Sequence, residues 1–425
     1  MQKIVEKLQN GLKGCVEIPS DKSISHRAVM LSSLAKGKSL IRNFSNGEDP
    51  ISTLKLFEQL GVKAKYIDEK TLEIVSEGKL SAPLKALDCG NSGTTMRLVS
   101  GILAGQKFNS TLIGDESLSK RPMKRIIEPL KLMGADIKST DFHAPLEIKG
   151  AHLNGIDYVS KLSSAQVKSC ILLAGLFADG ITKFTEPFIS RNHTEIMLKY
   201  MGADIITEGK TVSIKKSALL PQEINICGDI SSVAYFIVAA LIVPNSEIIL
   251  KNVGLNPTRT GILDVVKAME GNIEILDKKN ISGEDVGDIK VSYSELKSCI
   301  IQGELIPRLI DELPVIAVLA TQAQGVTTIK DAEDLRNKES DRIKSVVTEL
   351  KKIGAEIEET PDGFKITGKK QLKGGCEVET YHDHRLAMSL YVASLICERP
   401  LIINDFNWVN ISFPEFEKLF NTLIN

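Results

Sequence analysis

The chain has 425 residues, of which 43% are apolar and 25% are charged, and its formal net charge is −1. A chain of this length and composition is expected to fold into two or more globular domains. A net charge so close to zero argues against a general nucleic-acid-binding surface, because such surfaces are usually strongly basic.

Neither the cysteines nor the apolar segments point to export or to a membrane. Seven cysteines occur without a Cys-x-x-Cys pair, which predicts reduced and mostly buried thiols in the cytosol. The first residues, Met1–Lys13, mix charges and lack the apolar stretch of a signal peptide. The longest apolar run, Val233–Val243, is too short to span a bilayer and predicts a core helix.

The first polar motif, IPSDKSISHR at Ile18–Arg27, follows a predicted strand (Cys15–Ile18) and precedes a predicted helix (Ala28–Ala35). Three side chains are expected to line the strand-to-helix turn: Lys22, Ser23 and Arg27. Together they offer a point charge, a hydroxyl and a bidentate guanidinium, which suit a small anion. The motif also holds the residue types of a hydrolytic triad: Asp21, Ser25 and His26. Neighbours on one turn rarely face one another as a triad must, so the hydrolase interpretation is weak.

A degenerate repeat runs through the chain. Five segments each end an amphipathic helix with a glycine and then open a strand: Leu54–Tyr66, Ile127–Lys138, Met197–Thr207, Val265–Leu276 and Val347–Glu358. Their glycines are Gly61, Gly134, Gly202, Gly271 and Gly354. The spacing of roughly 70 to 80 residues fits a unit of about four strands and two helices. A sixth helix, Pro414–Leu423, ends the chain, so we expect two domains of three units each.

The starts of these helices carry capping residues or an early proline. Several also carry a cation: Arg121, Arg191, Arg259 and Arg342. A cation opposes the positive end of the helix dipole and costs stability unless an anion lies nearby. Helix N-termini combined with arginine therefore predict anion-binding sites.

Three motifs in the first half fit this interpretation. Asp88–Arg97 (DCGNSGTTMR) suits a backbone nest at a helix start, although a plain helix cap explains it equally well. Gly114–Arg125 crowds four cations around Pro122, as either an anion site or a solvated charge run. Ser163–Ser169 (SSAQVKS) opens a predicted helix, Val167–Ala178, with Ser163 or Ser164 as its cap, and Gln166 can hydrogen-bond an alcohol or a phosphate.

Three motifs in the second half add acid–base groups. Asp311 lies in an apolar stretch just before a predicted buried helix, as a candidate general base or as a helix cap. In NKESDR, Lys338 and Arg342 are expected to share one face of a helical turn, with Glu339 beside them. The motif HDHR precedes a predicted helix, Leu386–Ile396, and ends with Arg385 at its start. Its two histidines lack a further ligand cluster, so we expect no metal site.

Cations from both halves of the chain thus gather in anion-binding patterns: Lys22, Arg27, Arg121, Arg191, Lys338, Arg342 and Arg385. So large a set would be needed for two anionic substrates that carry phosphate and carboxylate groups.

Eight motifs occur in one order along the chain: PSDKSISHR, GNSGTTMR, RPM, SSAQVKS, ELIPRLIDELP, NKESDR, DHR and SFPEF. In these motifs the chain resembles the 5-enolpyruvylshikimate-3-phosphate synthases over essentially its whole length. The resemblance implies an α/β, two-domain enolpyruvyl transferase fold, with three βαβαββ units per domain in a pseudo-threefold arrangement. It implies an N-terminal domain of residues 21–228, a C-terminal domain of residues 1–20 plus 229–425, and an active site in the cleft between them.

The same resemblance implies an activity. The enolpyruvyl group of phosphoenolpyruvate would pass to the 5-hydroxyl of shikimate 3-phosphate by addition–elimination, in aromatic amino acid (chorismate) biosynthesis. No metal or organic cofactor, no nucleic acid and no membrane would take part, and we expect a cytosolic monomer.

Residue roles also follow from the resemblance. Residues expected to hold shikimate 3-phosphate are Lys22, Ser23, Arg27, Ser164, Gln166, Arg191, Asp311 and Lys338. Residues expected to hold phosphoenolpyruvate are Lys22, Gly93, Arg121, Gln166, Arg342 and Arg385. Asp311 would take the proton from the attacking hydroxyl, and Glu339, alone or with Lys22, would handle protons at the methylene carbon.

The chain departs from many members at two places. Asn410, Ile411 and Ser412 fill a stretch that often carries a lysine, and Arg191-Asn192-His193 replaces a Lys-Pro-Tyr; both traits resemble the divergent second class of the family. Gly93 is retained where some members of that class have alanine.

Three rival functions compete with this interpretation. A UDP-N-acetylglucosamine enolpyruvyl transferase carries a reactive cysteine before an Arg-Pro pair, whereas Ile113–Pro122 contains none. An RNA 3′-phosphate cyclase would require nucleic-acid contacts, which the net charge opposes. A non-catalytic phosphate-binding protein would not need Asp311 and Glu339, and both are present.

Overall fold

The computed structural model describes residues 1–424, which form two compact units. Unit 1 comprises Met1–Pro19, Cys227–Asn280 and the chain from Asp285 onward, and unit 2 comprises Ser20–Ile226 and Ile281–Glu284. The described residues form six small sheets, three within each unit, which accounts for the six repeats predicted from the sequence. The predicted α/β class is confirmed.

One repeat of unit 2 displays the common topology. It consists of β6 (Leu87–Asp88), α3 (Gly93–Ala104), β7 (Asn109–Ile113), α4 (Glu116–Ser119), α5 (Lys124–Leu132), β8 (Asp136–Thr140) and β9 (His143–Lys149). The sheet order is β6-β7-β9-β8, in which β6 and β7 are parallel and the other neighbours are antiparallel. Apart from the short α4, this is a βαβαββ unit, as the resemblance implied.

A second repeat of unit 2 follows the same order. Its elements are β10 (Asp157–Val159), α6 (Ala165–Gly175), β11 (Ile181–Thr185), α7 (His193–Tyr200), β12 (Ile205–Glu208) and β13 (Thr211–Lys215). The third repeat contains α1 (Lys22–Leu34), β3 (Lys36–Arg42), α2 (Glu48–Gln59), β4 (Lys63–Tyr66) and β5 (Leu72–Glu77). Its first strand, β14 (Glu223–Asn225), lies at the C-terminal end of Ser20–Ile226 and pairs in parallel with β3.

In unit 1, too, the first strand of one repeat is distant in sequence from the rest of that repeat. The strand β2 (Lys13–Glu17) pairs in parallel with β15. It completes a repeat whose other elements are α8 (Ile230–Ile242), β15 (Glu247–Gly254), α9 (Gly261–Ala268), β16 (Asn272–Ile281) and β17 (Glu284–Ser292). The chain thus leaves unit 1 between the first strand and the first helix of one repeat, and it returns at the same point.

Two further repeats complete unit 1. One consists of β18 (Ile300–Ile301), η1 (Gly303–Leu305), α10 (Ile306–Leu309), α11 (Leu313–Ala320), β19 (Val326–Ile329), η2 (Glu333–Asn337), α12 (Arg342–Lys352), β20 (Glu356–Thr360) and β21 (Gly363–Thr367). The other consists of β22 (Glu377–Val378), α13 (His384–Ser394), β23 (Leu401–Ile403), η3 (Phe406–Ile411) and α14 (Phe416–Leu423), with β1 (Lys3–Val5) paired to β23.

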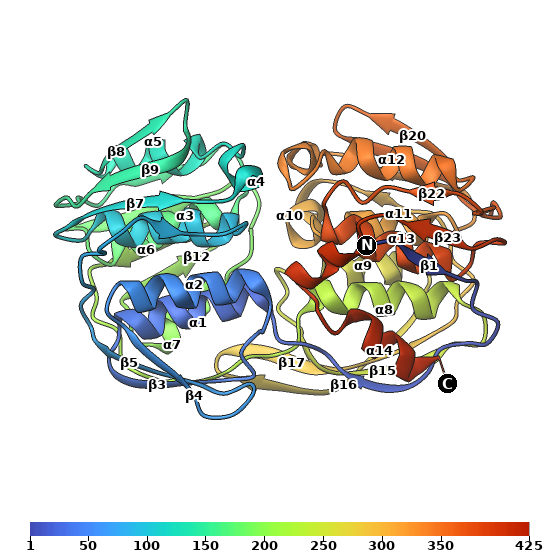
Figure 1. The fold of residues 1–425 in the computed structure, drawn as a ribbon, viewed down its shortest axis with the longest axis horizontal. Helices are drawn as coiled ribbons and strands as arrows, with labels where there is room; N and C mark the ends of the chain where they lie inside the picture. The colour runs from blue at the N-terminus through green and yellow to red at the C-terminus, as the bar shows by residue number, and fades with distance from the viewer. Residues whose placement is uncertain (425) are drawn as a thin grey trace. The chain divides into compact units, whose positions relative to one another are not determined.

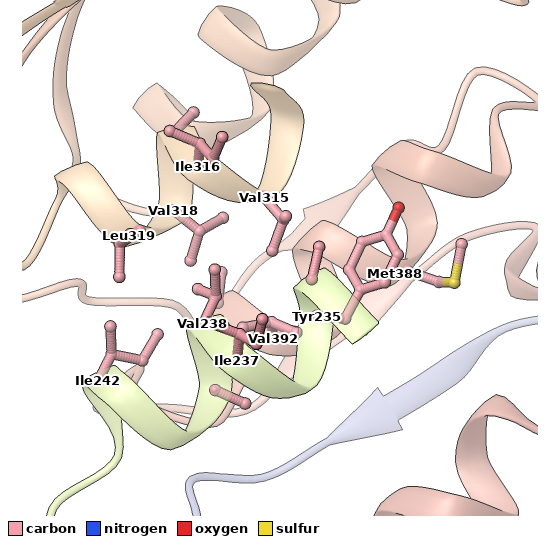
Figure 2. Close-up of a cluster of buried hydrophobic side chains, with 14 of the residues drawn as sticks. Tyr235, Ile237, Val238, Ile242, Val315, Ile316, Val318, Leu319, Met388 and Val392 are labelled. Atoms are coloured by element: carbon pink, nitrogen blue, oxygen red, sulfur yellow. The ribbon is translucent and has the colours of Figure 1, made fainter. Parts of the chain in front are cut away.

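The first helix of each repeat forms the core of its unit. In unit 1, α8, α11 and α13 lie side by side (Figure 1), and their apolar side chains interdigitate around Tyr235, Val238, Val315 and Val392 (Figure 2). Every residue of α8 is buried, as the prediction of a core helix at Val233–Val243 required. In unit 2, α3 and α6 approach so closely that a Cβ on Gly101 would lie 2.1 Å from the carbonyl oxygen of Cys170.

The second helices are amphipathic, and in all five glycine segments the helix ends before the glycine and a strand follows, as predicted. The backbone angle φ is positive at Gly61, Gly134, Gly202 and Gly354, between +87° and +99°. At Gly271 the predicted order also holds, since α9 ends at Ala268 and β16 opens at Asn272, but the left-handed residue there is Glu270, with φ of 61°.

Several predicted helix starts are displaced in the structure. The helix predicted at Ala28–Ala35 begins at Lys22, because Asp21 caps it by accepting a hydrogen bond from the Ile24 N–H at 2.8 Å. The helix that follows Pro122 starts two residues later, at Lys124. Lys338 does not share a helical turn with Arg342, since it terminates η2 while Arg342 begins α12.

Four of the seven cysteines are buried, as predicted for most of them, whereas Cys15 is exposed. Along residues 1–424, no helix combines the length and the apolar character needed to cross a membrane.

Candidate active site

In unit 2, the N-terminus of α3 gathers three predicted phosphoenolpyruvate residues. Gly93 is the first residue of the helix, which Ser92 caps by accepting from the Thr95 N–H at 3.1 Å. Arg121 donates from Nη2 to Asn91 Oδ1 at 2.8 Å, in the turn before that cap. Gln166, from α6, donates from Nε2 to Thr94 Oγ1 at 3.1 Å. Gly93, Arg121 and Gln166 therefore lie together.

Arg97 belongs to the same group, and sequence reasoning did not single it out. Its Nη1 donates to Gln166 Oε1 at 2.7 Å. A Cβ placed on Gly93 would lie 2.9 Å from Arg97 Nη1 and 3.5 Å from Arg121 Nη1. Two guanidinium groups thus border a helix N-terminus, an arrangement that suits an anion. The signal was present in the motif GNSGTTMR, which ends in this arginine.

Lys22 lies at the start of another first helix, α1. Its ammonium pairs with Asp49 Oδ2 at 3.0 Å, and both side chains are largely buried. Asp49 is in the first turn of α2, so this pair joins the two helices of one repeat.

Arg27 lies deeper than predicted. It is buried in the second turn of α1, and its guanidinium donates to Thr194 Oγ1 at 2.7 Å, Ser169 Oγ at 2.9 Å and the Ser23 carbonyl at 2.9 Å. The turn between strand and helix, where we expected it, is therefore not its position. Arg27 instead links α1 to the starts of α6 and α7.

The start of α6 offers hydroxyl groups. Ser164 occupies the cap position without a side-chain capping bond, so the predicted cap interaction is not formed. Ser163 instead accepts a hydrogen bond from the Phe188 N–H at 2.9 Å. Arg191 lies two residues before α7, directly after Ser190.

In unit 1, two of the three predicted catalytic residues, Asp311 and Glu339, lie in one cluster around Arg342. Asp311, in the turn between α10 and α11, has its Oδ1 3.4 Å from Lys338 Nζ and 3.4 Å from Arg342 Nη1. Arg342 Nη2 donates to Glu339 Oε2 at 2.7 Å. The alternative role of Asp311 as the cap of α11 is not observed, because Glu312 occupies that position.

Asp383 holds this cluster from the third repeat. It caps α13, and Arg342 Nε donates to its Oδ2 at 2.8 Å. Arg385 follows it in the first turn of α13 and contacts the Ser231 carbonyl at 3.4 Å, at the start of α8. Sequence reasoning quoted Asp383 within DHR but gave it no role, because a pairing between repeats cannot be read from local spacing.

The surrounding groups keep Arg342 and Arg385 charged. Burial alone would lower the pKa of Arg342, but the carboxylates of Asp383 and Glu339 outweigh it and raise this pKa above its ordinary value. Burial would also lower the pKa of Arg385, and the facing Tyr235 and Asp311 raise it instead. For Asp383, the raising effect of burial is exceeded by Arg342, so its pKa lies below its ordinary range. Two permanent cations therefore border Asp311.

Of the two histidines in HDHR, His382 is exposed and His384 is buried. His382 stacks on Trp408 at 4.8 Å, whereas His384 is buried in α13. Across residues 1–424, no three His, Cys, Asp or Glu side chains converge as metal ligands would.

Comparison with known proteins now identifies the family. A model of the family described as EPSP synthase (3-phosphoshikimate 1-carboxyvinyltransferase) matches residues 7–420. The chain is 50% identical over 414 residues to the 3-phosphoshikimate 1-carboxyvinyltransferase of Bacillus licheniformis, with 96% of each chain covered. It is 52% identical over 417 residues to that of a Thermoanaerobacter species, with 97% of this chain and 98% of the relative covered.

A solved structure agrees with these relatives. The EPSP synthase of Acinetobacter baumannii matches with a TM-score of 0.88 at 41% identity, covering 99% of this chain and 98% of that one. Since the match extends over nearly the whole chain in both sequence and fold, the chain belongs to the EPSP synthase family.

Proposed function

We propose that this chain transfers the enolpyruvyl group of phosphoenolpyruvate to the 5-hydroxyl of shikimate 3-phosphate and releases phosphate, in aromatic amino acid biosynthesis. The observation that carries this function is the family match over residues 7–420, with relatives of this activity at 50% identity. The anion-binding groups at helix starts in both units support it, because both substrates carry phosphate and carboxylate groups.

The chemistry proposed for unit 1 is proton transfer. Asp311 accepts the proton of the attacking 5-hydroxyl as its oxygen bonds to C2 of phosphoenolpyruvate. Glu339, alone or with Lys22, protonates the methylene carbon and later removes a proton from the resulting methyl group, when the C–O bond to phosphate breaks. Arg342 and Arg385, with Arg121, stabilise the charge that develops on the leaving phosphate and the carboxylate.

The substrate contacts are proposed by residue. Shikimate 3-phosphate is held by Lys22, Ser23, Arg27, Ser164, Gln166, Arg191, Asp311 and Lys338. Phosphoenolpyruvate is held by Lys22, Gly93, Arg121, Gln166, Arg342 and Arg385. Arg27 already donates three hydrogen bonds within unit 2, and its guanidinium has five N–H donors in all. Small molecules are the only partners proposed, for a monomer in the cytosol.

A phosphate-release assay tests the function. Purified protein mixed with shikimate 3-phosphate and phosphoenolpyruvate should release phosphate, and UDP-N-acetylglucosamine in place of shikimate 3-phosphate should not support release. Release only with the UDP-sugar would favour the related transferase. No release with either acceptor, despite binding of phosphoenolpyruvate, would favour a non-catalytic binding protein.

A further inference from the structure

Unit 2 buries an ammonium group that the proposed reaction does not use. Lys168, on α6, is 1% exposed. Its Nζ donates to Glu186 Oε1 at 2.8 Å and to the Ser190 carbonyl at 3.0 Å, and it lies 2.8 Å from Glu195 Oε1. Three acceptors match the three protons of an ammonium group, so the whole hydrogen-bonding capacity of Lys168 is spent inside the protein.

These three contacts fix the segment that leads to Arg191. Glu186 directly follows β11, and its Oε1 also accepts from the Ser190 N–H at 2.9 Å. The Ser190 carbonyl, which Lys168 holds, belongs to the peptide group that joins Ser190 to Arg191. Glu195 lies in the first turn of α7, just beyond Arg191. Lys168 therefore ties α6 to both sides of Arg191.

Lys168 is the positive charge that two buried carboxylates share. One amine faces two carboxylates, and Glu186, Glu195 and Lys168 are all at most 5% exposed. A further cation, Arg27, donates to Ser169 and Thr194, the residues next in sequence to Lys168 and Glu195. Without Lys168, two buried carboxylates would face each other with too little positive charge, and one of them would have to move.

Stability alone does not require such a group, since apolar side chains of similar size often replace a buried ion cluster without loss. What an ion cluster adds is a single fixed geometry. We propose that Lys168 is a positioning residue that sets the location of Arg191, and thereby the affinity for shikimate 3-phosphate, through Glu186 and the Ser190 carbonyl. This inference rests on the proposed function, because it takes Arg191 as a ligand of that substrate.

The test compares two lysine-to-methionine variants. Lys168→Met removes the ammonium and keeps an unbranched side chain that is one heavy atom shorter. Lys352→Met is the matched control: Lys352 pairs with the fully buried Glu349 at 2.9 Å in unit 1, among residues given no role in the site. Calorimetry should show shikimate 3-phosphate bound about tenfold or more weakly by Lys168→Met, and within about twofold of wild type by Lys352→Met. The KM for phosphoenolpyruvate, at saturating shikimate 3-phosphate, should stay within about twofold in both.

A double-mutant cycle distinguishes positioning of Arg191 from a general destabilisation of unit 2. If Lys168 acts through Arg191, its substitution should weaken binding by less than about threefold in an Arg191→Gln background. Independent effects of the two substitutions would overturn the proposal. So would a folded Lys168→Met that binds shikimate 3-phosphate within about twofold of wild type.

A second variant covers a failure of Lys168→Met to fold. Glu186→Gln keeps an oxygen for Lys168 and Ser190 but removes one charge, and it should weaken shikimate 3-phosphate binding about threefold or more. An unchanged dissociation constant in folded Glu186→Gln would overturn the inference. If the wild type does not bind shikimate 3-phosphate, the proposed function fails and the inference falls with it; wild-type binding beside unaffected variants overturns the inference alone.

Discussion

At the scale of single residues, the proposed chemistry depends most on Asp311, whose carboxylate lies 3.4 Å from both Lys338 and Arg342. Asp311→Asn keeps the shape of the side chain but cannot accept the proton of the hydroxyl. We expect kcat to fall by about 10²- to 10⁴-fold, the usual contribution of a general base, while both substrates still bind. Steady-state phosphate release measures kcat, and calorimetry measures binding. A variant within about threefold of wild type would rule out Asp311 as the base.

Gly93 leads to a second prediction at this scale. An alanine Cβ there would lie 2.9 Å from Arg97 Nη1, so the guanidinium must shift and its bond to Gln166 must lengthen or break. Helix formation tolerates the change, because alanine is a better helix former than glycine. Gly93→Ala should therefore raise the KM for phosphoenolpyruvate about tenfold, or about 1.4 kcal/mol, with little loss of thermal stability. An unchanged KM would show that neither guanidinium contacts that substrate.

Sequence patterns identified residue types at helix starts but not their partners from other repeats. Asp311, Glu339 and Arg342 were each recognised from local motifs, and the structure brings them together. Asp383 and Arg97 were missed as site residues, because their partners Arg342 and Gln166 come from different helices. Lys338 was recognised for a wrong reason, a shared helical face, although it does reach Asp311.

At the scale of elements, the buried ring of His26 joins three helices of unit 2. Its Nδ1 is 2.6 Å from Thr53 Oγ1, which is 2.7 Å from Thr95 Oγ1 in the first turn of α3. Burial, and then the charges of Lys22 and Arg27, hold the pKa of His26 well below its ordinary value. The folded protein therefore keeps His26 neutral at a pH where the unfolded chain binds a proton.

This difference sets the direction of a pH effect on stability. The unfolded state binds the extra proton below about pH 6.5, so stability is complete above that pH and is lost as the pH falls. His26→Gln has no titrating side chain at this position. Relative to the variant, the wild type should therefore lose about 1.4 kcal/mol of unfolding free energy between pH 7.5 and pH 5.5. Urea unfolding at the two pH values measures it, with exposed His152→Gln as control. A difference between wild type and variant that does not vary with pH would contradict a neutral His26.

The ends of the second helices could be predicted because glycine marks them locally, as at Gly61 and Gly354. The start of α1 could not. Ser25, His26 and Arg27 have the polarity of a loop, yet all three are buried and hydrogen-bonded inside the helix layer. Polarity indicates exposure only when a side chain has no partners, and those partners come from other repeats.

At the scale of the whole molecule, we propose that side chains, without a metal, balance the negative charge of the two substrates. The proposed positive groups are Lys22, Arg121, Arg342 and Arg385. In the part of the chain described, residues 1–424, no metal-ligating cluster occurs. Dialysis against a chelator should therefore leave phosphate release within about twofold of the untreated enzyme. Activity that disappears on chelation and returns with zinc would show that a metal takes part.

The exchanged strands β2 and β14 have a consequence for how the chain folds as it is synthesised. Residues 13–17 pair with residues 247–251, and residues 40–42 pair with residues 223–225. Pairings so distant in sequence are slow to form, because the intervening chain must first be ordered. On the ribosome, β2 has no partner until nearly all of unit 2 has emerged, and the first sheet of unit 2 keeps an open edge until β14 arrives. A permuted unit 2 with β14 placed before α1 would make every strand pairing in its three sheets local, and it should refold faster than the natural order.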